Sequence, residues 1–354
     1  MFFAGIGTAV PSRRYTQKEC WEALQRSPQF AVLKPRSKAT LQHVLLSESN
    51  GIRTRHLALE ALEEAFETDA DTLHARFARH APELAAAAAR SALRDADLQP
   101  RDVDAVLVST CTGYLCPGLT GYVGDRLGLR VDVLGLDLVG QGCAAALPNL
   151  RAAESLIAAQ RCGHVLSVCV EVCSAALYID DDSGVLVSAC LFGDGAGAAV
   201  LSAEPRPGRR HLQWKRAWSL TEPAYRDALR FEARGGVLRN ILTPEVPALA
   251  GRQAARLLRD ALKDAGLAPP DVRAWIWHAG GQRVLEELRT AAHLAAADME
   301  RSARVLNEFG NLSSPFVYFV LELARRERAP DGYWWLSSFG AGFSCHGALL
   351  AVSS

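Results

Sequence analysis

One cysteine, one histidine and one asparagine stand beside glycines where the sequence predicts that a helix or strand begins or ends. Cys143 follows Gly-Gln-Gly and precedes the helical segment AAALPNLRAAESL. His278 closes the apolar run RAWIWH and is followed by AGG, and Asn311 lies in FGNLSS ahead of a helix. These residue types together can carry out acyl transfer through a sulfur nucleophile.

Cys143 is the expected nucleophile. Unpaired N–H groups and the helix dipole favour an anion at a helix start, so we expect a lowered thiol pKa. Proline is tolerated in the first turn of a helix but destabilises a helix further in, which restricts where the helix around Pro148 can begin. Either the helix begins near Pro148 with Cys143 on a tight turn ahead of it, or its first turn is irregular; we favour the former. The alternative role for this cysteine is structural packing.

His278 and Asn311 are expected to be neutral hydrogen-bond donors. A histidine at the carboxyl end of a strand lies where open α/β sheets bind ligands. It can bond a thioester carbonyl or promote a nearby thiolate. Asn311 can stabilise an enolate oxygen, an effect worth about 3–4 kcal/mol for a well-placed donor. The structural alternatives are a satisfied core histidine and a helix N-cap asparagine.

A cysteine with two neutral donors suits decarboxylative Claisen condensation. The sulfur accepts an acyl group from a thioester, a malonyl-type thioester then loses CO₂, and the donors hold the enolate that attacks the acyl-cysteine. This chemistry requires no metal, nicotinamide or flavin. The glycines of LFGDGAGAA do not indicate a nucleotide loop, because they lead into a strand rather than opening a helix with GxGxxG spacing.

The other cysteines are expected to be reduced and packed. The chain has nine cysteines, an odd number without zinc-ligand spacing, and most lie in apolar runs such as HVLSVCVEV. A degradative thiolase would need a second catalytic cysteine, whereas Cys345, in a last-strand context, is better explained by packing.

An internal repeat predicts the domain organisation. Residues 91–110 match residues 260–279 at nine of twenty positions, and each segment reads as a helix end, a proline-bounded turn and a buried strand. At nearly the same offset Gly142 corresponds to Gly310, which places the nucleophile opposite the asparagine. We therefore predict two similar α/β halves that meet around the site.

The first half, residues 1–205, carries the cysteine, and the second, residues 206–354, carries the histidine and asparagine. Residues 204–215 have the proline, glycine and charge of a connection. Its basic cluster could contact a phosphate, but a solvated linker fits the pattern better.

Composition excludes several classes of protein. The chain of 354 residues is 49% hydrophobic and 22% charged, with a net charge of +0, so it can bury a sizeable core and lacks the basic balance of a nucleic-acid binder. Its start reads as a strand closing at Pro11 rather than an export signal. Because no apolar run is long enough to span a bilayer, we expect a cytoplasmic protein with no membrane or nucleic-acid partner.

The motif set resembles the type III polyketide synthases, the chalcone and stilbene synthase family of the thiolase superfamily. QGC at Cys143, HxGG at His278, FGNxSS at Asn311 and LFGDGA at 191–196 match in order and spacing. The resemblance runs from about Ser109 to the C-terminus. It implies an α/β, thiolase-like αβαβα fold, a homodimer, a pantetheine tunnel, and acyl-CoA and malonyl-CoA as substrates without a cofactor.

The resemblance also implies binding residues. Phe192 matches the gatekeeper phenylalanine between tunnel and cavity. The segments CTGYLCPGL, VEVCSA and SFGAG supply the cavity candidates Cys111, Thr112, Cys116, Cys173, Gly340 and Ala341. In the family the first segment also reaches the dimer partner. The first two look like those of bacterial alkylpyrone and alkylresorcinol synthases, which implies a fatty-acyl starter. Arg53 and Arg55 are the candidates for CoA binding.

Departures from the family pattern leave alternatives. Ala279 replaces the proline of HPGG, SFGAG replaces GFGPG, and the lysines that plant enzymes use at the CoA phosphates have no clear counterparts. Thioesters of CoA and of an acyl carrier protein therefore both stay open. One alternative is a ketoacyl-synthase-III-like enzyme that makes one condensation or ligates two chains, although its HQAN signature is absent. Another is a non-catalytic partner subunit, which would have little reason to keep the three site residues.

Overall fold

A nine-stranded mixed sheet organises the molecule, with strand order β11-β12-β13-β8-β1-β7-β6-β4-β5. The computed structural model describes residues 1–354 apart from the side chain of Glu48. The strands are β1 (Phe2–Ala9), β4 (Ala105–Ser109), β5 (Leu134–Leu138), β6 (His164–Glu171), β7 (Gly195–Ser202), β8 (His211–Thr221), β11 (Val272–Trp277), β12 (Gly332–Gly340) and β13 (Ser344–Ser353).

The sheet consists of two equivalent parts that meet where Phe2 of β1 pairs with Gln213 of β8. In the first part, the parallel pair β4 and β6 is followed by antiparallel β7 and β1. In the second, the parallel pair β11 and β12 is followed by antiparallel β13 and β8. This correspondence is what the internal repeat predicts. The exact division between residues 205 and 206, in the connection from β7 to β8, stays a prediction.

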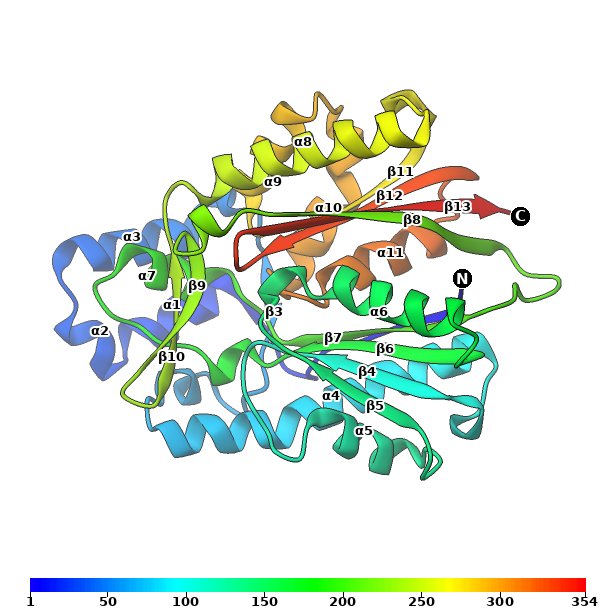
Figure 1. Ribbon diagram of the computed structural model, residues 1–354. Helices are drawn as coiled ribbons and strands as arrows, with labels where there is room; N and C mark the ends of the chain where they lie inside the picture. Colours follow the sequence, from blue (N-terminus) through cyan, green and yellow to red (C-terminus); the bar gives the residue numbers. More distant parts are fainter.

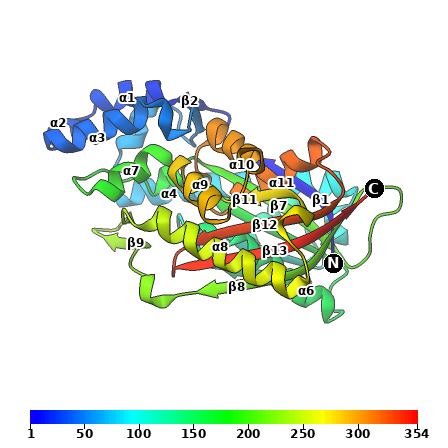
Figure 2. The same cartoon turned by 90° about the horizontal axis from the view of Figure 1, so that it is seen from above.

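Helices form three layers around the two sheet parts (Figures 1 and 2). In the middle layer, α6 (Ala146–Ala158) and α11 (Phe316–Arg326) contact strands of both parts. The outer layers are α4 (Ala70–Ala96) on the first part and α8 (Val246–Ala265) on the second. The result is the expected αβαβα arrangement.

Small residues permit the closest contact between layers. The buried face of α4 is rich in alanine, and β1 approaches it at two glycines. A Cβ on Gly5 would lie 2.2 Å from the carbonyl oxygen of Ala92. Backbone and helix therefore meet at distances that a larger side chain would prevent.

The remaining elements gather largely at one end of the sheet, on the left of Figure 1. Two separate two-stranded sheets pair β2 with β3, which are distant in sequence, and β9 with β10, which form a hairpin. The additional elements are α1 (Gln17–Gln25), α2 (Pro28–Val32), α3 (Pro35–Leu46), α5 (Leu119–Leu127), α7 (Ser183–Leu191), α9 (Gln282–Ala291), α10 (Ala296–Phe309), β2 (Arg14–Thr16), β3 (Thr54–His56), β9 (Leu229–Arg234) and β10 (Val237–Leu242).

The connection between the halves is tied to the protein surface. Arg206 and Arg209 both donate to the carbonyl oxygen of Asp95, at 3.2 and 2.9 Å, and Arg210 pairs with Asp331. These contacts fit a linker better than a phosphate site. Within the described residues, no helix is both long and apolar enough to cross a membrane.

Candidate active site

Cys143 lies on a 3₁₀ turn, Gly142–Ala144, that leads into α6. Gly142 has a φ of 53°, which glycine adopts without a steric penalty. Because α6 begins at Ala146, Pro148 falls in the first helical turn, where a missing N–H costs no hydrogen bond. This is the arrangement that we favoured from the sequence.

The end of β12 supports this turn. Ser338 Oγ donates to the carbonyl oxygen of Ala144 at 3.0 Å. Gly340 lets the strand approach closely, because a Cβ there would lie 2.6 Å from the backbone nitrogen of Ala144. Gly340 thus positions the turn, whereas Ala341 lines the adjoining cavity.

His278 extends β11 by one residue, and its N–H donates to the carbonyl oxygen of Ser337 at 2.9 Å. Phe316 and Phe339 hold its ring in edge contacts, with centroids 5.4 and 4.9 Å away. The side chain is buried, and neither ring nitrogen has a hydrogen-bond partner among the described residues. Burial lowers the pKa of His278 to about 3, so the imidazole is neutral at physiological pH.

Asn311 joins the two halves at the site. Its N–H donates to Leu191 O at 2.9 Å, and the N–H of Gly193 donates to Asn311 O at 3.0 Å. Its side-chain Nδ2 donates to Gly280 O at 3.2 Å, and its Oδ1 accepts from the N–H of Ser313 at 2.8 Å. Since an amide nitrogen carries two hydrogens, one stays available for a ligand.

Two chambers meet at Cys143. Cys143, Phe192 and Leu229 line both of them, whereas His278 and Asn311 line only the outer one. The cavity volume is about 460 Å³ in the outer chamber and about 50 Å³ in the inner one. The structure therefore brings the three predicted catalytic residues to one space, with Phe192 at its boundary.

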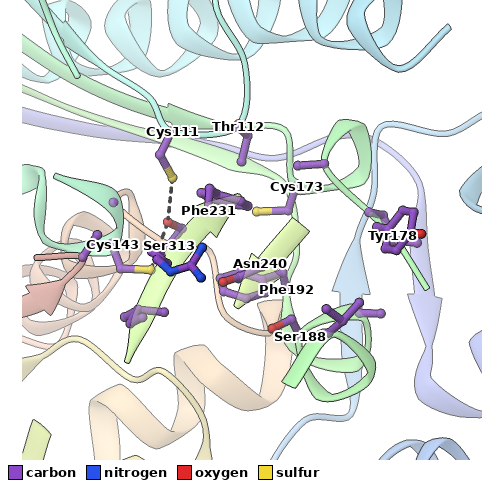
Figure 3. Close-up of a pocket in the computed structure, with 18 residues that line it drawn as sticks. Cys111, Thr112, Cys143, Cys173, Tyr178, Ser188, Phe192, Phe231, Asn240 and Ser313 are labelled. Carbon is purple, nitrogen blue, oxygen red and sulfur yellow. Dashed lines mark hydrogen bonds between the residues drawn. The ribbon is translucent and has the colours of Figure 1, made fainter. Parts of the chain in front are cut away.

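The inner chamber contains most of the predicted cavity residues (Figure 3). Cys111, Thr112, Cys173 and Ala341 line it, whereas Cys116 is exposed and lines neither chamber. α7 and the β9–β10 hairpin also contribute lining residues that the motifs did not predict, namely Tyr178 just ahead of α7, Ser188, Leu229, Phe231 and Asn240. No local pattern marks these residues, because only packing of distant segments brings them to the cavity.

Enclosure changes the expected chemistry of the nucleophile. Burial raises the pKa of Cys143 to about 12, although a hydrogen bond from Ser313 Oγ to its sulfur at 3.2 Å opposes that shift. The prediction of a lowered pKa is therefore wrong: loss of water outweighs the favourable helix start. The resting sulfur is a neutral thiol at physiological pH.

Behind the sulfur lies a fully buried carboxyl group, Glu171. It accepts hydrogen bonds from Ser314 Oγ at 2.6 Å and Thr112 Oγ1 at 3.0 Å, and Ser313 Oγ lies 3.5 Å from it. Burial raises the pKa of Glu171, which these hydrogen bonds oppose. A single acid in the apolar run SVCVEV is unusual, and this local pattern is the signal that could have indicated Glu171 as a site residue.

The two predicted CoA-binding arginines lie in different environments. Arg55 is 3% exposed, and its guanidinium donates to Gln17 Oε1 and to the carbonyl oxygens of Ala189 and Phe192, at 2.8–3.0 Å. This placement does not agree with a CoA phosphate contact; Arg55 instead fixes the Phe192 loop. Arg53 is exposed but lines neither chamber, and its CoA role stays a prediction.

The layered fold, with Cys143, His278 and Asn311 at one chamber, defines a thiolase-fold condensing enzyme. The model of the family described as FAE1/type III polyketide synthase-like protein matches residues 9–217, and that of the chalcone and stilbene synthase C-terminal domain matches residues 227–351. The chain belongs to the type III polyketide synthase family and is thus an acyltransferase of the condensing type. The alignments with its sequence relatives include 98% of the chain.

Two relatives and two solved structures illustrate the similarity. The chain is 32% identical to 1,3,6,8-tetrahydroxynaphthalene synthase of Streptomyces peucetius subsp. caesius and 30% identical to 3,5-dihydroxyphenylacetyl-CoA synthase of Amycolatopsis balhimycina, with 98% of this chain and 92% of each relative covered. It matches the tetrahydroxynaphthalene synthase structure from Streptomyces coelicolor A3(2) with a TM-score of 0.88, 25% identity and both chains fully covered. PKS-I from the brown alga Ectocarpus siliculosus shares the fold, with a TM-score of 0.90, 24% identity, and 99% of this chain and 97% of that one covered.

Proposed function

We propose that Cys143, His278 and Asn311 catalyse successive decarboxylative condensations of acyl and malonyl thioesters. The observation that carries this proposal is the shared chamber: His278 and Asn311 face the space in which Cys143 also meets the inner cavity. The sulfur can hold a chain that extends inward while the two donors act on a thioester that arrives from outside.

In the loading step, the Cys143 thiol attacks the carbonyl carbon of an acyl thioester. A carbon–sulfur bond to the enzyme forms, the bond to the CoA sulfur breaks, and the cysteine proton leaves with the CoA thiol. Because burial raises the pKa of Cys143 to about 12, the proton leaves during the attack rather than before it. The Ser313 hydrogen bond stabilises the charge that develops on sulfur.

In the extension step, a malonyl thioester loses CO₂ in the outer chamber, and the electron pair moves onto its carbonyl oxygen. The free Nδ2–H of Asn311 and the neutral imidazole of His278 donate to that enolate. The enolate carbon then attacks the acyl group, a carbon–carbon bond forms, and the Cys143 sulfur leaves as thiolate. Removing one such donor lowers turnover by about 10²–10³-fold.

The small inner chamber favours a short starter over the fatty-acyl starter that the sequence implied. At rest its volume of about 50 Å³ accommodates a starter of a few atoms, and the chamber must widen as the chain grows. A long alkyl tail would require Tyr178, Phe192 or Phe231 to move. The names of the relatives refer to a tetrahydroxynaphthalene and a dihydroxyphenylacetyl-CoA. We therefore propose a short acyl or malonyl starter and a hydroxylated, cyclised polyketide product.

The outer chamber is the proposed entrance for CoA thioesters. His43, Ser47, Asn50, Gln282 and Arg283 line it, and Arg283 is exposed in the first turn of α9. An exposed arginine at a helix start can meet a phosphate group. We therefore propose CoA thioesters as the substrates, with carrier-protein thioesters as the alternative.

A second copy of the chain is the proposed partner at β5. This strand ends the nine-stranded sheet, so one of its edges is unpaired. Leu134 on this strand, Val131 before it and Val139 directly after it are exposed, as is Tyr114 in the segment after β4. Contact across a twofold axis would cover these apolar side chains and explain why Cys116, in that same segment, faces away from the cavity.

Intact-mass measurement tests the function directly. Incubation with a short acyl-CoA should add one acyl group, and Cys143→Ala should abolish the adduct while Cys111→Ala, which keeps the nucleophile, retains it. Labelled malonyl-CoA should then give several two-carbon additions and a cyclised product. A single addition would indicate the ketoacyl-synthase-III-like alternative, and an adduct on another residue would contradict the assignment of Cys143.

A further inference from the structure

The inner chamber has a mostly apolar wall interrupted by two unpartnered neutral polar side chains, Ser188 and Asn240. Ser188 is 5% exposed, and its hydroxyl makes no hydrogen bond within the described part of the chain. A helical serine commonly donates to the carbonyl four residues earlier, which Ser188 does not do. Asn240 is half-buried and its amide makes no hydrogen bond among the described residues; both side chains line the same chamber.

Packing of α7 on β10 brings the two residues to one wall. The contact is closest at Gly184, where a Cβ would lie 2.2 Å from the carbonyl oxygen of Leu242. Ser188 lies one helical turn, about 6 Å, beyond Gly184. Asn240 lies two residues, about 7 Å, before Leu242 and on the same face of the strand. Figure 3 shows both beside the Phe192 loop that separates the chambers.

The position of Asn240 is fixed by its neighbours. Asn240 pairs with Phe231 across the β9–β10 hairpin, so both side chains lie on the chamber face. The adjacent Arg239 is buried and forms ion pairs with Asp180 at 2.6 Å and Glu232 at 3.3 Å. The amide is thus held in place rather than carried on a free loop.

The charges around the chamber favour an uncharged ligand. Arg230 also lines the chamber; its guanidinium lies 3.2 Å from Asp227 and 3.1 Å from Glu232, which offset its charge, although its Nε makes no hydrogen bond among the described residues. A carboxylate brought here would lose its hydration without gaining an unpaired positive charge. A ketone oxygen needs only neutral donors, which the Ser188 hydroxyl and the Asn240 amide supply.

We infer that Ser188 and Asn240 form a subsite for a ketone or enol oxygen of the growing chain. This inference rests on the proposed function and adds a substrate class to it. A poly-β-keto chain carries an oxygen on every second carbon, whereas an alkyl chain offers none. Binding one ketone fixes the register of the chain within the inner chamber. The pair therefore selects oxygenated chains over aliphatic ones of equal length and keeps them bound through later extensions.

The test compares thioesters that differ only in ketone groups. The probes are N-acetylcysteamine thioesters of 3-oxobutanoate against butanoate, and of 3,5-dioxohexanoate against hexanoate. The variants are Ser188→Ala, Asn240→Leu and the double variant, with Val185→Ala as an apolar control from the same wall. Intact mass gives the rate of Cys143 acylation, and product mass gives the number of extensions.

In the parent and in Val185→Ala, the oxo thioester of one or both pairs should acylate Cys143 at least about tenfold faster than the alkyl thioester of equal length. In the double variant this preference should fall to within about twofold, chiefly because oxo thioesters react more slowly, and products should shift toward fewer extensions. Asn240→Gln should recover part of the preference. Equal preference in the parent and double variant at both chain lengths would overturn the inference. Absence of any acyl-Cys143 in the parent would instead contradict the proposed function.

Thermal unfolding distinguishes a variant that fails to fold from one that no longer prefers oxo thioesters. Removing an unpaired buried hydroxyl exposes no new unsatisfied group, so Ser188→Ala should unfold at or above the parental temperature. A Ser188→Ala protein with parental stability and parental oxo preference would count against a role for Ser188.

Discussion

Ser313 Oγ donates a hydrogen bond to the Cys143 sulfur at 3.2 Å and lies 3.5 Å from the buried carboxyl of Glu171. The same hydroxyl lies 3.8 Å from the sulfur of Cys111 (Figure 3). Ser313 therefore stands between the proposed nucleophile and a polar cluster that contains an acid. Because burial raises the pKa of Cys143, this hydrogen bond is a specific stabiliser of negative charge on the sulfur.

Replacing Ser313 by alanine should slow acylation of Cys143 by about tenfold. The substitution removes one hydrogen bond to the developing thiolate, and such a bond contributes about 1.5 kcal/mol or more when its acceptor is charged. Iodoacetamide should inactivate Ser313→Ala more slowly than the parent at every pH from 7 to 10, because a smaller fraction of the Cys143 sulfur is thiolate. Ser338→Ala is the matched control, since Ser338 bonds the turn backbone rather than the sulfur. Equal inactivation rates in the parent and Ser313→Ala would contradict this role.

Replacing Phe231 by alanine should enlarge the inner chamber and admit longer starters. Phe231 lines that chamber from β9 and does not line the outer one. Each additional buried methylene contributes about 0.8 kcal/mol, so kcat/KM for octanoyl-CoA relative to butanoyl-CoA should rise at least about tenfold. Val32→Ala, at an exposed position of α2, should leave the ratio unchanged. A ratio unchanged in Phe231→Ala would show that another residue limits starter length.

Buried His278 should make the protein less stable in mild acid. Its pKa is lowered from 6.5 to about 3, so below pH 6.5 the unfolded chain binds a proton that the folded state excludes. Between pH 6.5 and 5 this difference removes about 2 kcal/mol from the free energy of unfolding. His278→Asn should abolish that part of the loss in urea unfolding measured at both pH values.

A second buried histidine contributes acid sensitivity that persists in this variant. Burial, and then the charge of Arg151, lower the pKa of His346 to about 4. Replacing the exposed His43 should leave the acid-dependent loss unchanged. If His278→Asn loses as much stability between pH 6.5 and 5 as the parent does, His278 is protonated in the folded protein.

Asp95 should stabilise the packing of β1 against α11. Its carboxylate accepts from Arg325 Nη1 at 2.6 Å and from the N–H of Ile6 at 2.9 Å. Burial alone would raise the pKa of Asp95, but these contacts lower it overall. The stabilisation is thus present above the unfolded pKa near 3.8 and is lost as the pH falls through the lower folded value.

Asp95→Asn should lower the free energy of unfolding by about 1.5–3 kcal/mol at pH 7, with a smaller difference from the parent below pH 4. Denaturant titrations at several pH values measure this change. Asp97→Asn is the matched control, because Asp97 is largely exposed and pairs with Arg206 at the surface. That control should cost about 0.5 kcal/mol or less. A pH-independent loss in Asp95→Asn would contradict the ionic contribution.

Charges on the β5 edge should prevent the proposed self-association. Leu134→Glu combined with Val139→Lys places charged groups in the apolar strip along the unpaired edge. Sedimentation should show the parent as a dimer, and the double variant should dissociate at least about 100-fold more readily. Val32→Glu, an equally exposed apolar position on α2, should stay dimeric. A monomeric parent would refute the interface.

The local features of this protein could be predicted because neighbouring residues encode them. Residues 91–110 and 260–279 each form a helix end, a 3₁₀ turn and a strand, as their repeated pattern indicates. Gly142 and Gly310, which correspond in the repeat, have positive φ values of 53° and 72°. Periodicity, glycine and proline act over a few residues, so the sequence by itself determined the duplicated fold and the candidates for nucleophile and donors.

Only the tertiary structure decided the environment of those residues. The sequence makes Arg55 a candidate for CoA binding, but the Phe192 loop and Gln17 enclose it. The thiol of Cys143 follows a helix-start pattern that favours an anion, yet burial raises its pKa. The inner chamber is closed by α7 and the β9–β10 hairpin, which reach it from distant parts of the chain. Burial and cavity shape are sums over such long-range contacts, so no local pattern contains them.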